Sequence, residues 1–410
     1  QSGSALTIST PGDGTVTAAK IASGAVVTAK IADDAIDGTK IADDSVDTEH
    51  LVANSVGTGA IAPNAVATEH IANSAVTAAK IASGSKLVTT DAQNNTVVGT
   101  NAGDAFDGTN ATGNTLIGKD VGTAITTGDF NTGVGRSALL TNTTGGSNSG
   151  FGVNALYYNS TGSNNVAVGT SALEANTTAD NNTAVGYQAL IVNTTGTQNT
   201  ALGYRSLESN TTGSYSTAVG NECLENNTTG RNTAYGHRSL RTVTTASNNT
   251  GIGDHALNAN TGDRNTALGH AALQQNTTAD NNTAVGYQAL TAATTGNKNV
   301  AIGAYTADAI TTGISNTAVG EQSMRNLTTG ARNVAIGQGT LSGSSTASNN
   351  TAVGQAALNA NTSGGSLTAV GRNALTSNTT ADDNTAIGVE AMASNTTGEY
   401  NTAVGYAALT

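Results

Sequence analysis

A glycine that follows a short apolar pair recurs along most of the chain at a nearly constant interval, and this periodicity limits the possible folds more than any other feature. The interval is 17 residues, with one step of 19 and two of 16. The unit reads NTAVGYQALxxNTTGxx and is plainest at residues 182–196 and 282–296. A short period with one strand, one glycine and one turn is typical of a β-solenoid, whose coils stack about 4.8 Å apart. We therefore expect an all-β fold, a parallel β-solenoid or β-roll with 17-residue coils over residues 95–410.

The first part of each unit has the alternation of a short strand. Thr183 and Val185 point to one face of such a strand and Ala184 to the other. A leucine follows the repeat glycine by four residues, and methionine replaces it in two repeats. The sequence predicts that the larger apolar residues at these positions form the core of the solenoid: Val168, Val185, Leu190, Val285, Leu290, Ile302 and Val404.

The repeat glycines and the NTTG segments are the predicted turns. A glycine after the strand permits a turn that a Cβ would block, or the close approach of another backbone. NTTG is predicted to turn because Asn and Gly tolerate left-handed conformations. The glycines singled out as turn residues are Gly169, Gly186, Gly203, Gly220, Gly286, Gly303 and Gly405.

In two repeats the leucine is displaced. After Gly118 and Gly303, the sequence AITTG at 124–128 and 309–313 places the packing residue seven positions after the glycine instead of four. We expect a local irregularity in these two coils.

A second repeat system with a period of five runs over residues 15–84. Its apolar positions recur without a miss, and the predicted core of this segment includes Val16, Ile21, Val26, Ile31 and Ile41. A period of five matches neither an α-helix nor an alternating strand. The sequence predicts a decapeptide-repeat shaft of short strands and turns. A quadrilateral pentapeptide solenoid is the alternative, although Asp34, Asp44 and Glu49 occupy positions where that fold prefers small residues.

The chain thus divides into four predicted segments. Residues 1–14 form an N-terminal segment in which SALTIST at 4–10 alternates like a strand, and such a strand could pair with a neighbouring molecule and join fibres end to end. Residues 15–84 form the shaft, 85–94 a junction and 95–410 the solenoid. One apolar residue in five cannot be buried within one chain, and each coil offers about two sizeable apolar side chains, so both repeat systems favour a homotrimer that buries a second face and hides sheet edges.

Composition excludes several classes of function. The formal net charge is −12 and no basic stripe is present, which argues against a nucleic-acid partner. No apolar run approaches the roughly 18 residues of a membrane span. One cysteine, Cys223, cannot form a disulfide framework within the chain, and it reads as a small buried side chain in place of the usual alanine. The chain begins at Gln1, as expected after removal of a secretion signal or for a piece of a longer protein.

Several polar motifs have a chemical and a structural interpretation. Asp-Asn clusters at 180–182, 280–282 and 382–384 could bind calcium or form solvated turns. Rows of threonine raise the hypothesis of ice binding. The Asn-x-Thr sequons either carry glycans or build turns and ladders: Asn142, Asn176, Asn193, Asn210, Asn227, Asn276, Asn378 and Asn395.

No catalytic, cofactor or metal site is predicted. The five histidines, at positions 50, 70, 237, 255 and 270, share no spacing typical of metal ligands. A glycan-cleaving fibre would need paired carboxylates in a cleft, and no insertion interrupts the coils to build one. We therefore expect a protein that is not an enzyme and that binds no cofactor.

Three motifs resemble known fibre proteins. The cores NVAVG and NVAIG at 165–169, 299–303 and 333–337 resemble head repeats of trimeric autotransporter adhesins, although those heads use a shorter unit. VTAKIADDAI at 27–36 resembles shaft repeats of phage tail fibres. The NTAVGYQALxxNTTG array resembles repeats that precede an endosialidase-type chaperone domain in phage and bacterial surface fibres, and no such domain is present here.

The resemblance implies a homotrimeric rod that is secreted or lies on a bacterial surface. Its expected function is adhesion, display or filament formation, with itself as the main partner and a cell-surface receptor or glycan as a further one. The alternative is a phage tail fibre or injection-system fibre, in which case the chain belongs to a virion.

Overall fold

The computed structural model describes residues 89–106 and 108–410. The chain separates into two compact units, 1–77 and 78–410, and all described residues belong to the second. The N-terminal segment and the shaft, including the predicted core residues Val16, Ile21, Val26, Ile31 and Ile41, lie outside the described residues.

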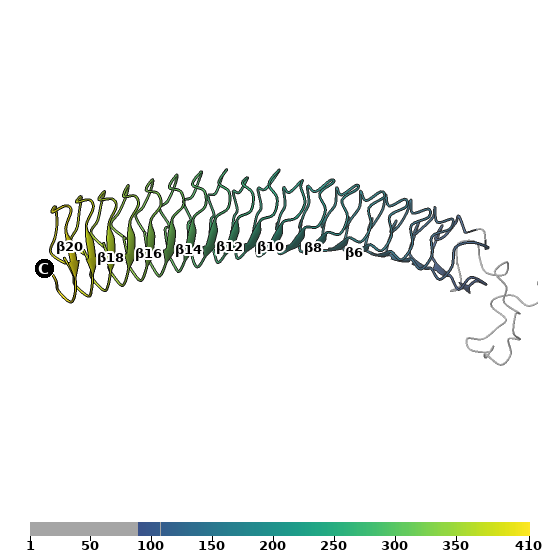
Figure 1. The fold of residues 1–410 in the computed structure, drawn as a ribbon. Coiled ribbons are helices and arrows are strands. Elements are labelled where there is room, and N and C mark those ends of the chain that lie inside the picture. Colours follow the sequence, from purple (N-terminus) through teal and green to yellow (C-terminus); the bar gives the residue numbers. More distant parts are fainter. Residues whose placement is uncertain (1–88, 107) are drawn as a thin grey trace, which may run out of the picture. The chain divides into compact units, whose positions relative to one another are not determined.

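The described residues form one β-solenoid of about 18 turns without a helix, and its coils stack along one direction (Figure 1). A two-residue strand, β1 (Thr89–Thr90), runs antiparallel to the first strand of the stack. Each coil then contributes one three-residue strand. These 19 parallel strands are β2 (Thr96–Val98), β3 (Thr115–Ile117), β4 (Thr132–Val134), β5 (Ser149–Phe151), β6 (Val166–Val168), β7 (Thr183–Val185), β8 (Thr200–Leu202), β9 (Thr217–Val219), β10 (Thr233–Tyr235), β11 (Thr250–Ile252), β12 (Thr266–Leu268), β13 (Thr283–Val285), β14 (Val300–Ile302), β15 (Thr317–Val319), β16 (Val334–Ile336), β17 (Thr351–Val353), β18 (Thr368–Val370), β19 (Thr385–Ile387) and β20 (Thr402–Val404).

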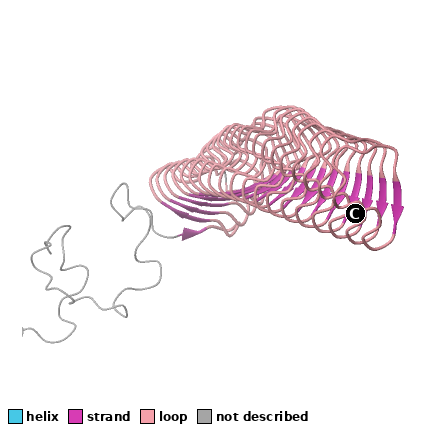
Figure 2. Ribbon diagram, turned by 90° about the vertical axis from the view of Figure 1, so that its left-hand side faces the viewer, coloured by secondary structure: helices cyan, strands magenta, loops and turns pink. Residues whose placement is uncertain are grey.

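The strands pair in chain order and in register. Each strand residue faces its equivalent in the next coil, as Thr183 faces Thr200 and Ala184 faces Ala201. Figure 2 shows the strands side by side as one continuous sheet along the stack. The prediction of an all-β parallel solenoid with 17-residue coils is confirmed. Because each sequence repeat forms one coil, equivalent residues of successive repeats lie above one another.

The interior of the solenoid is narrow and is filled by alanine and leucine. The middle residue of each strand points inward, and Ala184 is fully buried there. Leu190 and Leu290, four residues after their repeat glycines, are also fully buried, as predicted. These side chains lie in the interior of a single chain, so the coil closes its own core without a second chain.

The prediction that the large strand residues form this core is wrong. Val168, Ile302 and Val404 are 37%, 41% and 69% exposed, and Val185 and Val285 are only half-buried. The predicted alternation along the strand is correct, but the opposite face points inward. A three-residue strand has one inward and two outward side chains, and the space beside the stacked leucines accepts a methyl group better than a valine.

Asparagine side chains form ladders inside the coil. Asn182, which precedes β7, is fully buried; its Nδ2 donates to the carbonyl oxygen of Gly196 at 2.8 Å, and its Oδ1 accepts the backbone N–H of Asn199 in the next coil at 2.9 Å. A second ladder runs through the NTTG turns, where Asn176 Nδ2 donates to Asn159 Oδ1 at 2.7 Å. Buried amides with both groups bonded cost little, so polar residues can line a thin core.

The repeat glycines have both of the predicted roles. All seven named turn glycines adopt φ between 131° and 138°. At Gly169, an added Cβ would lie 2.5 Å from the carbonyl oxygen of Gly186 in the next coil. Only glycine adopts this backbone conformation readily and, having no Cβ, lets the backbone of the next coil come so close.

The NTTG segments turn as predicted, but for a different reason. Asn193 and Gly196 are not left-handed; the left-handed residues of this coil are Gln188 and Leu190, just after the repeat glycine, and Gln198, two residues after Gly196. The amide of Gln188 donates back to Thr170 O at 3.0 Å, and the amide of Leu190 donates forward to Ser206 O at 3.0 Å. The left-handed residues thus extend the inter-coil hydrogen bonding beyond the strands.

The two coils with AITTG keep the regular path, so the predicted irregularity is wrong. Ile125 and Ile310 are buried in the slot that Asn193 holds in other coils, while Gly122 and Ala307 take the leucine slot. An added Cβ at Gly122 would lie 2.8 Å from Ile125 Cδ1. The isoleucine therefore fills the volume that the missing leucine leaves, together with Leu116 in the first of the two coils, and the register is unchanged.

Replacing a repeat glycine should destabilise the stack far more than replacing a glycine at an open position. We expect Gly169→Ala to lower the free energy of unfolding by about 3 kcal/mol or more, because strain at this φ adds to a backbone collision. The control is Gly339→Ala, where φ is 62° and the nearest atom to the added Cβ is Asn359 Nδ2 at 3.7 Å. Urea unfolding followed by circular dichroism measures both, and equal losses would contradict the assigned role.

Candidate functional site

The outward side of strands β2–β20 is an uncharged surface, here called the sheet face. It consists of the first and third residues of each strand. The first is threonine or serine except for three valines, and the third is apolar or aromatic in every one of these strands. The third-position side chains that are at least 37% exposed are Ile117, Phe151, Val168, Leu202, Tyr235, Ile252, Leu268, Ile302, Ile336, Ile387 and Val404. Contiguous exposed apolar surface of this kind is typical of interaction surfaces.

An open hollow of about 430 Å³ interrupts the turn side of the solenoid. It is lined by residues 212–215, 228–231 and Ser247, where the coil that follows Gly220 is one residue short. Tyr215 is 57% exposed here, and the Arg231 guanidinium lies 5.9 Å from its ring centroid. The hollow thus places an exposed aromatic ring beside hydroxyl groups and an arginine.

An ion-pair network ties coils together near the middle of the stack. Arg238 Nε lies 2.7 Å from Glu222 Oε2, and Arg241 Nε lies 2.5 Å from Glu225 Oε2. The hydrogen bond from Arg238 is the main cause of the lowered pKa of Glu222. Each of these carboxylates is paired with an arginine of the next coil, and Arg205 of the preceding coil also approaches Glu225. The network therefore cross-links three coils.

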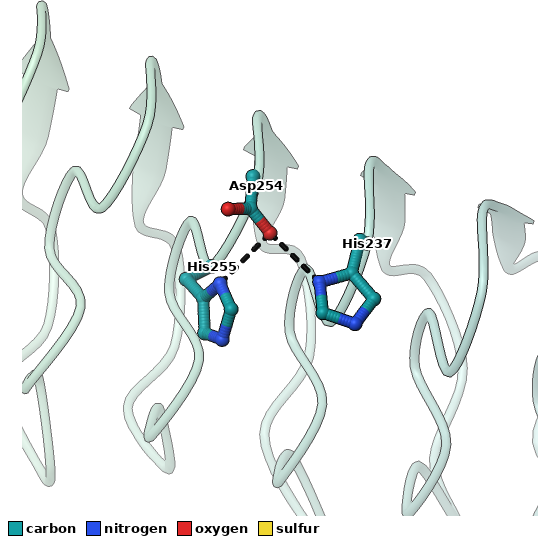
Figure 3. Close-up of side chains that lie close together, drawn as sticks. All are labelled: His237, Asp254 and His255. Atoms are coloured by element: carbon teal, nitrogen blue, oxygen red, sulfur yellow. Dashed lines mark hydrogen bonds and ion pairs between the residues drawn. The ribbon is translucent and has the colours of Figure 1, made fainter.

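Three histidines converge on the carboxylate of Asp254. Two of them, His237 and His255, are drawn with Asp254 in Figure 3. His237 Nδ1 lies 2.9 Å and His255 Nδ1 2.8 Å from the same oxygen, Oδ1. His270 Nε2 lies 3.5 Å from Oδ2. Burial acts to raise the pKa of Asp254, but the hydrogen bonds and charges of His237 and His255 outweigh it and lower the pKa. Of these side chains, His237, Asp254 and His255 form the group in the described part of the chain whose ligand atoms lie close enough together to hold a metal ion.

The search for metal-ligand spacings in the sequence did not find this cluster, because its members are separated along the chain by about one coil. His237, Asp254 and His270 each follow a repeat glycine directly, in three successive coils, and His255 follows Asp254. Separations of 17 and 16 residues in sequence become neighbouring rows in the stack. Comparing the residue at one repeat position across coils would have found the cluster.

The sequons are parts of the inner ladder and not of the surface. Seven of the eight asparagines are fully buried, and Asn395 in the penultimate coil is half-buried. The Nδ2 of Asn193 donates to Asn176 Oδ1 at 3.0 Å and to Gly196 O at 2.9 Å. A glycan cannot be attached to an amide nitrogen that is buried in this way, so the interpretation as turns and ladders is the one the fold supports.

The aspartates of the Asp-Asn clusters bond to the preceding coil. Asp180 Oδ1 accepts the backbone N–H of Ser163 at 2.6 Å, Asp280 Oδ1 that of Asp263 at 2.7 Å, and Asp382 Oδ1 that of Gly365 at 2.6 Å. The three clusters therefore satisfy turn amides, which explains their place at the start of a strand segment without calcium.

The comparisons with known proteins assign no family. No protein-family model matches the chain, and no curated protein has a significantly similar sequence. Among the described residues, no helix has the length and apolar character needed to cross a membrane.

Cys223 should be inert while the protein is folded. It is fully buried in the slot that Ala189 holds in another coil, as predicted, and burial raises the pKa of its thiol to about 12. The reactive thiolate is therefore almost absent at pH 8. We expect no reaction with a thiol reagent at pH 8 in the native protein and rapid, complete reaction in denaturant. Rapid reaction of the native protein would show that the central coils open.

Proposed function

We propose that this chain is the structural subunit of an extracellular fibre in which three copies associate side by side through the sheet face. The observation that carries the proposal is the uninterrupted apolar row along strands β2–β20. At about 4.8 Å per strand, this row is roughly 85 Å long. Monomeric soluble proteins rarely expose so long an apolar surface.

A second copy of the chain has the surface that such a row requires. The partner must be flat, uncharged and apolar over the same length, and its side chains must repeat at the same spacing. Another sheet face meets all these conditions, because parallel copies place equivalent coils at the same level. The charged groups, with a net charge of −12 per chain, would then face outward and keep fibres soluble.

Three copies close the assembly by rotation around the rod axis. The number three is supported by the resemblance of the repeats to trimeric adhesin heads and tail-fibre shafts. The interior of each chain is complete by itself, so association buries the outer surface and leaves the inner core unchanged. The fibre would serve adhesion, display or filament formation on a bacterial surface, and the hollow beside Tyr215 is where we expect a glycan contact.

The threonine row on the same face favours ice binding as a second candidate function. Thr183, Thr200 and Thr217 lie above one another in register on the outward side of the strands. A flat, regular row of this kind can order water. This function requires the sheet face to be open, so the oligomeric state separates the two proposals.

Charges placed on the sheet face should dissociate the trimer. We expect wild-type protein to have the mass of a trimer by native mass spectrometry, and Ile302→Lys/Ile336→Lys to run as a monomer with an unchanged circular dichroism spectrum. The control, Thr312→Lys/Thr346→Lys, adds the same charge at exposed turn positions of the same region and should remain trimeric. A monomeric wild type would overturn the proposal, and ice-growth inhibition by that monomer would favour the second function.

A further inference from the structure

We propose that His237, Asp254, His255 and His270 form a binding site for a divalent transition-metal ion of the Zn²⁺ type. The ligands come from three successive coils near the middle of the stack, so a bound ion would cross-link those coils.

The ligand atoms already lie close to the arrangement that Zn²⁺ requires. His237 Nδ1, His255 Nδ1 and an oxygen of Asp254 all lie within 4.8 Å of one another. Ligands at about 2.0–2.2 Å around a tetrahedral ion are separated by about 3.3 Å. Small rotations of the His237 and His255 rings would therefore let the ion bind between the two Nδ1 atoms. His270 Nε2 lies 3.5 Å from Oδ2, the other oxygen of the Asp254 carboxylate.

The donor set selects the class of metal. Imidazole nitrogens with one carboxylate suit Zn²⁺ and its neighbours in the transition series, whereas Ca²⁺ and Mg²⁺ prefer sites made of oxygen atoms. The four side chains are 27 to 46% exposed, so an ion can enter from solvent and a water molecule can complete its coordination.

Without a metal ion, His237 and His255 both hydrogen-bond to the carboxylate of Asp254. A carboxylate oxygen can only accept, so the Nδ1 atoms of His237 and His255 must both carry protons when they bond to the single Oδ1 of Asp254. A metal ion replaces these two bridging protons, because each Nδ1 must be unprotonated to act as a ligand. A neutral ring then carries its proton on Nε2.

The backbone holds the ligands in place. The amide of His255 donates to His237 O at 3.0 Å, and Gln288 N donates to His270 O at 3.0 Å, so each ligand residue is fixed to a neighbouring coil. The ring of His270 also stacks on Tyr287, with centroids 5.2 Å apart and an interplanar angle of 11°. Ligands fixed in this way lose little freedom on binding, which favours affinity.

Zinc titration of the full-length chain tests the site. We expect isothermal titration calorimetry to show a single tight Zn²⁺ site in wild type that is lost, or weakened more than about tenfold, in Asp254→Asn and in His255→Gln. The matched control is Glu321→Gln, because Glu321 is an exposed carboxylate that follows Gly320 directly, in the repeat position of Asp254. The control should bind as wild type does.

Two further readouts keep the test decisive. Zn²⁺ should raise the melting temperature of wild type and Glu321→Gln but not of the site variants. Co²⁺ should give the visible absorption of a coordinated ion in the same two proteins alone. If a site variant does not fold, His237→Gln replaces it, since that ring is 45% exposed. Equal Zn²⁺ binding by wild type and the folded site variants would overturn the proposal.

Discussion

Backbone hydrogen bonds between successive coils are the interaction on which the whole structure depends. They join the strands in register, and the left-handed residues after each repeat glycine continue them, as Leu190 N donates to Ser206 O of the next coil. The coils can approach this closely only because a repeat glycine such as Gly169 has no Cβ to meet the next backbone. Every other feature follows from the exact alignment of equivalent residues that these contacts impose.

The alignment of equivalent residues explains how a chain with few large side chains can fill its interior. Alanine from the strand, leucine after the glycine and asparagine from the turn stack on their own copies in most coils, and buried asparagines such as Asn182 and Asn176 bond to a neighbouring coil. Where a small residue replaces the leucine, a larger side chain nearby in the same coil fills the space, as Ile125 does beside Gly122. The interior is thus complete in one chain, and the larger apolar residues of the strands are left for the outside.

Alignment also creates surfaces that the linear sequence does not display. The outward valines and isoleucines become one long row, and Asp254 meets histidines from the coils before and after it. Both features arise because a repeat position is also a position in space. A fibre assembled through the apolar row would use many coils. A metal ion bound at Asp254 would use several coils, and neither surface corresponds to one local sequence motif.

The sequence by itself determined the solenoid, its period, the turn glycines and the buried leucines, because all of these follow from a repeat that glycine and strand alternation impose on each coil. Only the tertiary structure decided which strand face points inward. Alternation fixes that Ala184 and Val185 lie on opposite sides, but the width of the interior beside Leu190 decides that the alanine is buried. The cluster around Asp254 also required the structure, because its members are neighbours through stacking and not through the chain.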